Sequence, residues 1–208
     1  MTTRTRTALV AGATTPLGGA IADRLTRAGF DLGTSGPLDV AVYAALDQES
    51  LTPRRLTQID EATFGRWCEA PMRAFLEWMQ PVHERLSRRS GTLVLVAPTV
   101  SQEGAAGLVP YATAVEGQRL LAKSAARQWA PEGVTVVIVA PRLEVLLEAG
   151  SSLGEGTDAT RTSPVLGAPY YGIDAVAGVV SMLASSEPGA RPLSGATIPV
   201  DGGALMAP

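Results

Sequence analysis

The chain has 208 residues, of which 46% are hydrophobic and 18% charged, with a formal net charge of -3. This composition predicts one domain, residues 1–208, with a sizeable core, and excludes the strongly basic surface that nucleic-acid binding needs. A single cysteine and a single histidine exclude an internal disulfide and a soft-metal cluster. Since no run of 18 apolar residues occurs, we expect no membrane span and a cytoplasmic location.

A glycine-rich turn follows the first expected strand. Residues 8–11 form a short apolar run that is typical of a buried parallel strand, and apolar residues recur at helical spacing from 20 to 28. Backbone amides at such a helix start can bind a phosphate, although a plain strand–helix joint is the alternative. The residues that would form a nucleotide site here are Gly12, Thr14, Thr15, Leu17 and Gly18.

Strands and helices alternate along the rest of the chain. We expect further strands at 39–45, 91–97, 134–140 and 196–200, and helices at 64–88, 111–129 and 174–184. Thr63 is expected to cap the first of these helices, and Pro71 and Pro81 to kink or break it. Because the strands are apolar throughout, the pattern predicts a Rossmann-like α/β fold, a doubly wound parallel sheet with helices on both faces. The polar segment at 142–172 is expected to be a lid or a disordered loop.

Three stretches of the chain resemble the short-chain dehydrogenase/reductase (SDR) superfamily. The opening resembles that family's T-G-x-x-x-G-x-G dinucleotide loop, residues 91–141 resemble its strand–loop–Tyr helix–strand–Pro block, and residues 193–203 resemble its C-terminal signature. The resemblance implies hydride transfer between NAD(P) and a carbonyl or alcohol. It also implies a catalytic Tyr, a Lys four residues later, a Ser thirteen residues before, and an Asn in an earlier helix.

The chain departs from this catalytic pattern at three of the four positions. Tyr111 matches, whereas Val115 stands at the Lys position, Pro98 at the Ser position and Pro71 near the Asn position. A free tyrosine titrates near pH 10, so it needs a nearby cation to act as a base at neutrality. Thr99 and Ser101 carry the nearest alternative hydroxyls, so the catalytic candidates are Tyr111, Thr99 and Ser101. No metal ligand is predicted.

The cofactor half is also reduced. Ala11 replaces the first Thr of the dinucleotide loop, Pro16 replaces its middle Gly, and the family's second-to-third strand region is largely deleted, leaving residues 30–38. The strand that would carry the charged residue that recognises the ribose 2′ position is then missing. We therefore expect no NAD(P) binding or weak binding. A first helix leading straight into the strand beyond the first would make a rare left-handed crossover. We therefore expect either an irregular wrap or one short strand at 30–38.

Three functional hypotheses follow from this pattern. The favoured one is a non-catalytic SDR-fold subunit that pairs with itself or with an active SDR through the helices after residues 63 and 111 and the last strand. The second is a biosynthetic enzyme that reuses the pocket for an elimination, cyclisation or isomerisation, with Tyr111 as acid or base. Its lid would supply Glu144, Glu148, Asp158, Arg161, Tyr170 and Tyr171. The third is a divergent NAD(P)H-dependent ketoreductase.

Overall fold

The protein is built around one parallel β-sheet. The computed structural model describes residues 4–147, 153, 157, 163–166, 170–185 and 190–206. Six strands lie in the order β2-β1-β3-β4-β5-β6, and every neighbouring pair is parallel. Their bounds are Arg6–Ala11 (β1), Phe30–Leu32 (β2), Val40–Tyr43 (β3), Thr92–Val96 (β4), Thr135–Pro141 (β5) and Thr197–Val200 (β6). The predicted Rossmann-like fold is confirmed.

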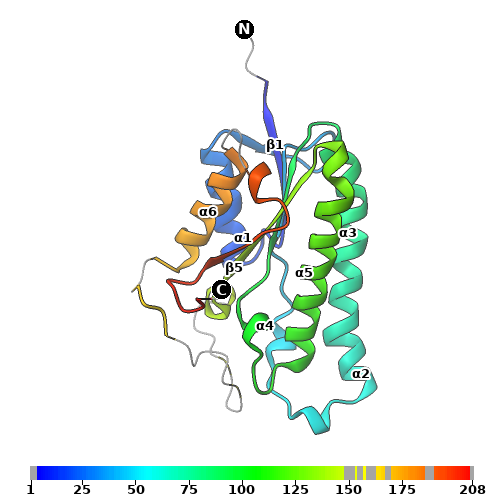
Figure 1. The fold of residues 1–208 in the computed structure, drawn as a ribbon, viewed down its shortest axis with the longest axis vertical. Coiled ribbons are helices and arrows are strands. Elements are labelled where there is room, and N and C mark those ends of the chain that lie inside the picture. Colours follow the sequence, from blue (N-terminus) through cyan, green and yellow to red (C-terminus); the bar gives the residue numbers. More distant parts are fainter. Residues whose placement is uncertain are drawn as a thin grey trace.

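Helices cover both faces of the sheet (Figure 1). The α-helices are Pro16–Arg27 (α1), Glu61–Phe64 (α2), Ala70–Ser87 (α3), Val100–Glu103 (α4), Val109–Trp129 (α5) and Ile173–Ser185 (α6). α1 and α6 pack together on one face, and α3 and α5 on the other. None of the helices in the described ranges is long and apolar enough to cross a membrane.

The two faces hold two separate hydrophobic clusters, because side chains alternate along each strand. On β3, Val40 and Val42 join the cluster under α1 and α6, while Ala41 and Tyr43 join the cluster under α3 and α5. The other central strands alternate in the same way, and every residue of β5 is buried. A sheet covered on both faces therefore explains why these strands are apolar throughout.

Residues 30–38 contain the short strand that was one of the two expected alternatives. Leu32 of β2 and Val40 of β3 pair with the same residue of β1, Ala8, from opposite sides. The segment that joins β2 to β3 therefore crosses β1 near its start. The crossing segment is tied to α3, where the Arg85 Nε donates to the Gly36 carbonyl at 2.7 Å. β2 thus keeps the usual connection from β1 through α1 to its neighbour, and no left-handed crossover through α1 is needed.

The helical region before α3 begins earlier than expected. The expectation that Thr63 is the cap was wrong: Asp60 is the N-cap residue of α2, and its carboxylate accepts a hydrogen bond from the Thr63 amide at 2.8 Å. A π-helical segment, Gly65–Glu69, then leads into α3. Pro71 lies in the first turn of α3, directly after the π-helical segment, and Pro81 lies inside the helix.

The single cysteine, Cys68, is fully buried in this segment. Burial raises the pKa of its thiol, and the neighbouring Glu69 carboxylate raises it further. Because the thiolate is the reactive form, we expect no modification of the native protein by a disulfide reagent at mildly alkaline pH, and complete modification in urea. The reaction is measured by the absorbance of the thiolate that the reagent releases. A rapid reaction of the native protein would contradict the burial of Cys68.

Candidate functional site

A small cavity lies at the carboxyl ends of β3 and β4, beside the start of α5. Its lining includes Tyr111, Val115, Pro98 and Pro71, so the four positions of the expected catalytic pattern do converge in space. The cavity volume is about 30 Å3. A cavity of this size holds one or two water molecules, whereas ligand pockets usually measure about 300–1,000 Å3.

Apolar side chains fill the space beside Tyr111. Leu46, Val96, Val115 and Leu146 all line the cavity, and Tyr111 itself is only 5% exposed. Burial raises the pKa of Tyr111 well above its ordinary value. The phenol therefore stays protonated at neutral pH, and the position one helical turn on carries no cation to stabilise a phenolate.

The two other catalytic candidates are not among the residues that line this cavity. Thr99 is buried, and its amide bonds the Pro141 carbonyl at 2.9 Å. The Ser101 hydroxyl lies 2.8 Å from the Glu116 carboxylate and accepts a hydrogen bond from Arg119 at 3.0 Å. The structure thus places Tyr111 at the cavity and Ser101 in a separate polar cluster.

That cluster is centred on Arg119, a fully buried side chain on α5. Its Nη2 donates to the carbonyls of Ala97 and Pro98, each at 3.1 Å, and its Nε to Glu116 at 2.8 Å. These two carbonyls follow β4 directly. Arg119 therefore fixes the path of the chain between the sheet and α4.

The glycine turn after β1 is held together by hydrogen bonds between its own residues. Thr15 is the N-cap of α1: its hydroxyl donates to the Gly12 carbonyl at 2.8 Å and accepts from the Gly18 amide at 3.1 Å. Pro16 has no amide hydrogen. Of the amides at 16 to 18, one is therefore absent and one is already bonded, which weakens the expected phosphate site. Thr14 is exposed, and Leu17 is buried in the core.

The residues present do not fit a dinucleotide in the usual SDR position. β2 ends at Leu32 and is followed by Gly33, and no charged residue occurs between there and Asp39 to read the ribose. Asp31 lies within β2, beside Thr7 of β1. A nicotinamide ring would need more space than the cavity of about 30 Å3 beside Tyr111 provides.

Much of the expected lid lies outside the described residues, including Glu148, Asp158 and Arg161. Glu144 lies in a 3-10 helix, Leu143–Leu146, and pairs with Arg142 at 2.5 Å. The Arg142 guanidinium also lies 5.9 Å from the centre of the Tyr171 ring, while Tyr170 is exposed. No cluster of metal-ligating side chains occurs in the described part of the chain.

Sequence reasoning did not single out three polar residues of the cavity wall, namely Asp47, Ser50 and Gln118. The Gln118 amide donates to the Pro71 carbonyl at 3.0 Å and so ties α5 to the start of α3. Ser50 donates to the Asp47 carbonyl at 2.5 Å. These two hydrogen bonds join the Gln118 amide and the Ser50 hydroxyl to other residues of the cavity wall.

Comparison with known proteins agrees with this architecture. A family model described as enoyl-(acyl carrier protein) reductase matches residues 32–204. The crystal structure of landomycin C-6 ketoreductase LanV with bound NADP and rabelomycin has a TM-score of 0.72 at 19% identity, covering 97% of both chains. The chain belongs to the short-chain dehydrogenase/reductase superfamily. Within it, the chain belongs to the family described by the enoyl-(acyl carrier protein) reductase model.

Curated relatives match a shorter stretch. The 3-oxoacyl-[acyl-carrier-protein] reductase FabG of Salmonella typhimurium is 31% identical over 121 residues, which is 58% of this chain and 48% of that protein. FabG of Escherichia coli K12 matches with the same identity and coverage. The match thus spans about half the length of these relatives.

Proposed function

We propose that the protein is a non-catalytic SDR-fold subunit that assembles with itself or with an active SDR. One observation carries the proposal: Tyr111, Val115, Pro98 and Pro71 surround a cavity of about 30 Å3. A redox site would need space there for a nicotinamide ring and a substrate carbonyl, together with a cation near the phenol. The closed turn at Thr15 supports the same proposal, because the amide of Gly18 is already bonded.

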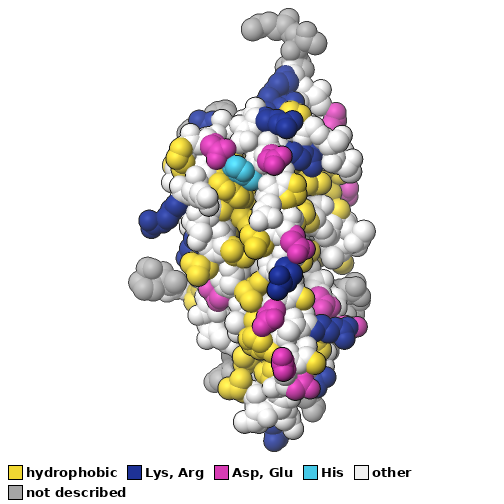
Figure 2. All heavy atoms as spheres, turned by 90° about the vertical axis from the view of Figure 1, so that its right-hand side faces the viewer, with side chains coloured by type: hydrophobic (Ala, Val, Ile, Leu, Met, Phe, Trp, Pro, Cys, Tyr) yellow, Lys and Arg dark blue, Asp and Glu magenta, His cyan; other side chains and the backbone are white. Residues whose placement is uncertain are grey.

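The face formed by α3 and α5 is the surface proposed for assembly. Figure 2 shows hydrophobic side chains running down this face between charged ones. Leu76 on α3 is 40% exposed and Leu120 on α5 is 66% exposed. Burying such a stripe against a partner releases water from apolar surface, which favours association.

The proposal predicts an assembled protein without dinucleotide affinity. Titration with NADPH and NADH by calorimetry should show no binding up to about 1 mM, while native mass spectrometry shows a dimer or larger species. Leu120→Arg should shift that mass to the monomer without unfolding the chain. Met182→Arg, a matched change at an exposed residue on α6, should leave the mass unchanged. If the native protein is monomeric, the partner to test is a second SDR chain. Tight NADPH binding would overturn the proposal.

An NAD(P)H-dependent reductase is the second candidate, because the relatives named above are reductases. Tyr111→Phe separates it from the first, since the change removes only a hydroxyl. If the protein is an enzyme that uses the Tyr111 hydroxyl, the Tyr111→Phe variant should keep the assembly and lose the reductase or isomerase activity of the native protein. An unchanged activity in the Tyr111→Phe assembly supports the subunit role.

A further inference from the structure

A second hollow, far larger than the cavity at Tyr111, lies between the segment after β3 and the start of α5. Its volume is about 920 Å3. The residues that line it, which we call the Arg55 hollow, are Thr52, Pro53, Arg54, Arg55, Leu56, Thr57, Gln58, Ala106, Gly107 and Val109. Among these described residues two are cations and none is an anion, in a chain whose net charge is -3.

The two walls of the hollow are joined by the backbone. The Arg54 amide donates to the Gly107 carbonyl at 2.9 Å, which ties residues 52–58 to the chain that enters α5. The Arg54 guanidinium lies 5.0 Å from the centre of the Trp67 ring, so the side chain is held by a cation–π contact. The hollow is therefore bounded by two segments that are fixed to each other.

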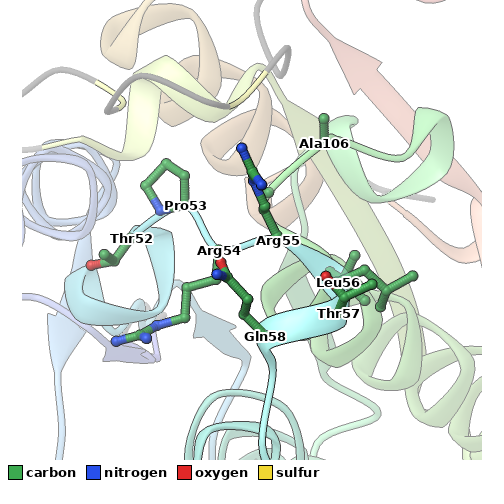
Figure 3. Close-up of a pocket in the computed structure, with 10 residues that line it drawn as sticks. Thr52, Pro53, Arg54, Arg55, Leu56, Thr57, Gln58 and Ala106 are labelled. Atoms are coloured by element: carbon green, nitrogen blue, oxygen red, sulfur yellow. The ribbon is translucent and has the colours of Figure 1, made fainter.

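The two arginines differ in how their charge is used. Figure 3 shows their guanidinium groups diverging, with that of Arg55 directed toward the side of Ala106. The charge of Arg54 contributes to lowering the pKa of Asp60, after the larger effect of the hydrogen bonds from Thr63. The Arg55 side chain forms no hydrogen bond or ion pair with any residue in the described ranges, and it is exposed. Within the described part of the chain, the guanidinium of Arg55 is thus left without a counter-ion.

We infer that the Arg55 hollow binds a small organic anion, a phosphate or carboxylate group carried on an apolar body. The guanidinium of Arg55 would pair with the anionic group, for which its planar fork of donors is suited. Pro53, Leu56 and Val109 supply apolar wall for the body of the ligand. The inference goes beyond the proposed subunit role and does not depend on it.

Binding of n-hexyl phosphate and of hexanoate tests the inference, with Trp67 as the reporter. We expect either ligand to change tryptophan fluorescence, with a Kd near or below about 1 mM, and the Trp67→Phe protein to lose most of the change. Inorganic phosphate should bind at least about threefold more weakly than hexyl phosphate, because it lacks the apolar body. A preference between the two organic ligands assigns the head group.

Two charge-matched variants identify the site. Arg55→Gln should weaken binding about tenfold or more, whereas Arg88→Gln, an exposed arginine at the end of α3, should change it less than about twofold. Thermal melts check that both variants are folded. Absence of binding at about 10 mM, or equal weakening by both variants, would overturn the inference. Neither result would alter the assembly mass or the nucleotide titration, so the two proposals fail separately.

Discussion

Replacing Arg119 by alanine should lower the free energy of unfolding by about 3 kcal/mol or more. The side chain is 2% exposed and donates to two carbonyls that follow β4. Its removal leaves those carbonyls without this donor and opens a void the length of an arginine side chain. Both effects cost free energy in the folded state only, since water would satisfy the carbonyls in the unfolded chain. Urea denaturation of the two proteins measures the difference.

Two further variants show which part of this cost is polar. Arg127→Ala removes an exposed arginine from the same helix and should change stability by less than about 0.5 kcal/mol. Arg119→Met keeps most of the volume and loses the donors, so it should fall between the two. The side chain of Glu116 is 44% exposed, so its carboxylate can be hydrated in either variant. If Arg119→Ala is as stable as Arg127→Ala, the cluster does not hold the chain after β4.

The strands and helices were predictable because burial leaves a periodic or continuous apolar pattern. The strands at 92–96 and 135–141 lie within one or two residues of the expected ranges. β2 could not be assigned, because a strand of three residues has no measurable period and its place depends on pairing with β1. The cap at Asp60 was missed because a π-helical segment lengthens the helical region before Pro71.

The residues around the cavity were predictable only in part, and its volume was not predictable. Of the three catalytic candidates, Tyr111 lines the cavity, whereas Thr99 and Ser101 do not. The motif spacing indicated which residues would occupy the four catalytic positions, and these four do lie together. The cavity is lined by Leu46, which lies outside any helix or strand, and by Leu146, at the end of a short 3-10 helix. In neither segment does a sequence pattern indicate where a side chain will lie. Arg119 did leave a signal. It stands in helical register with the buried residues Val115, Ala122 and Ala126, where a charge is unexpected.

Gly18→Ala should be among the most destabilising single-methyl changes in the chain, at about 3 kcal/mol or more. A Cβ at Gly18 would lie 1.9 Å from the Gly12 carbonyl oxygen and 2.5 Å from its carbon. Both are backbone atoms of the turn, so no side chain can rotate to make room. Gly12 in turn approaches the Ala44 carbonyl, 2.5 Å from where its own Cβ would be, so the turn cannot retreat toward β3.

Gly19→Ala is the matched control, one residue further along α1. There the Cβ would lie 3.4 Å from the Ala13 carbonyl oxygen, an ordinary contact, and alanine favours the helix by up to about 1 kcal/mol over glycine. Urea denaturation should therefore separate the two variants by about 4 kcal/mol. This outcome would mean that Gly18 is required by the packing of α1 against the turn, whether or not a nucleotide binds. Equal stability of the two variants would mean that the turn can open, and an opened turn would free the Gly18 amide for a phosphate.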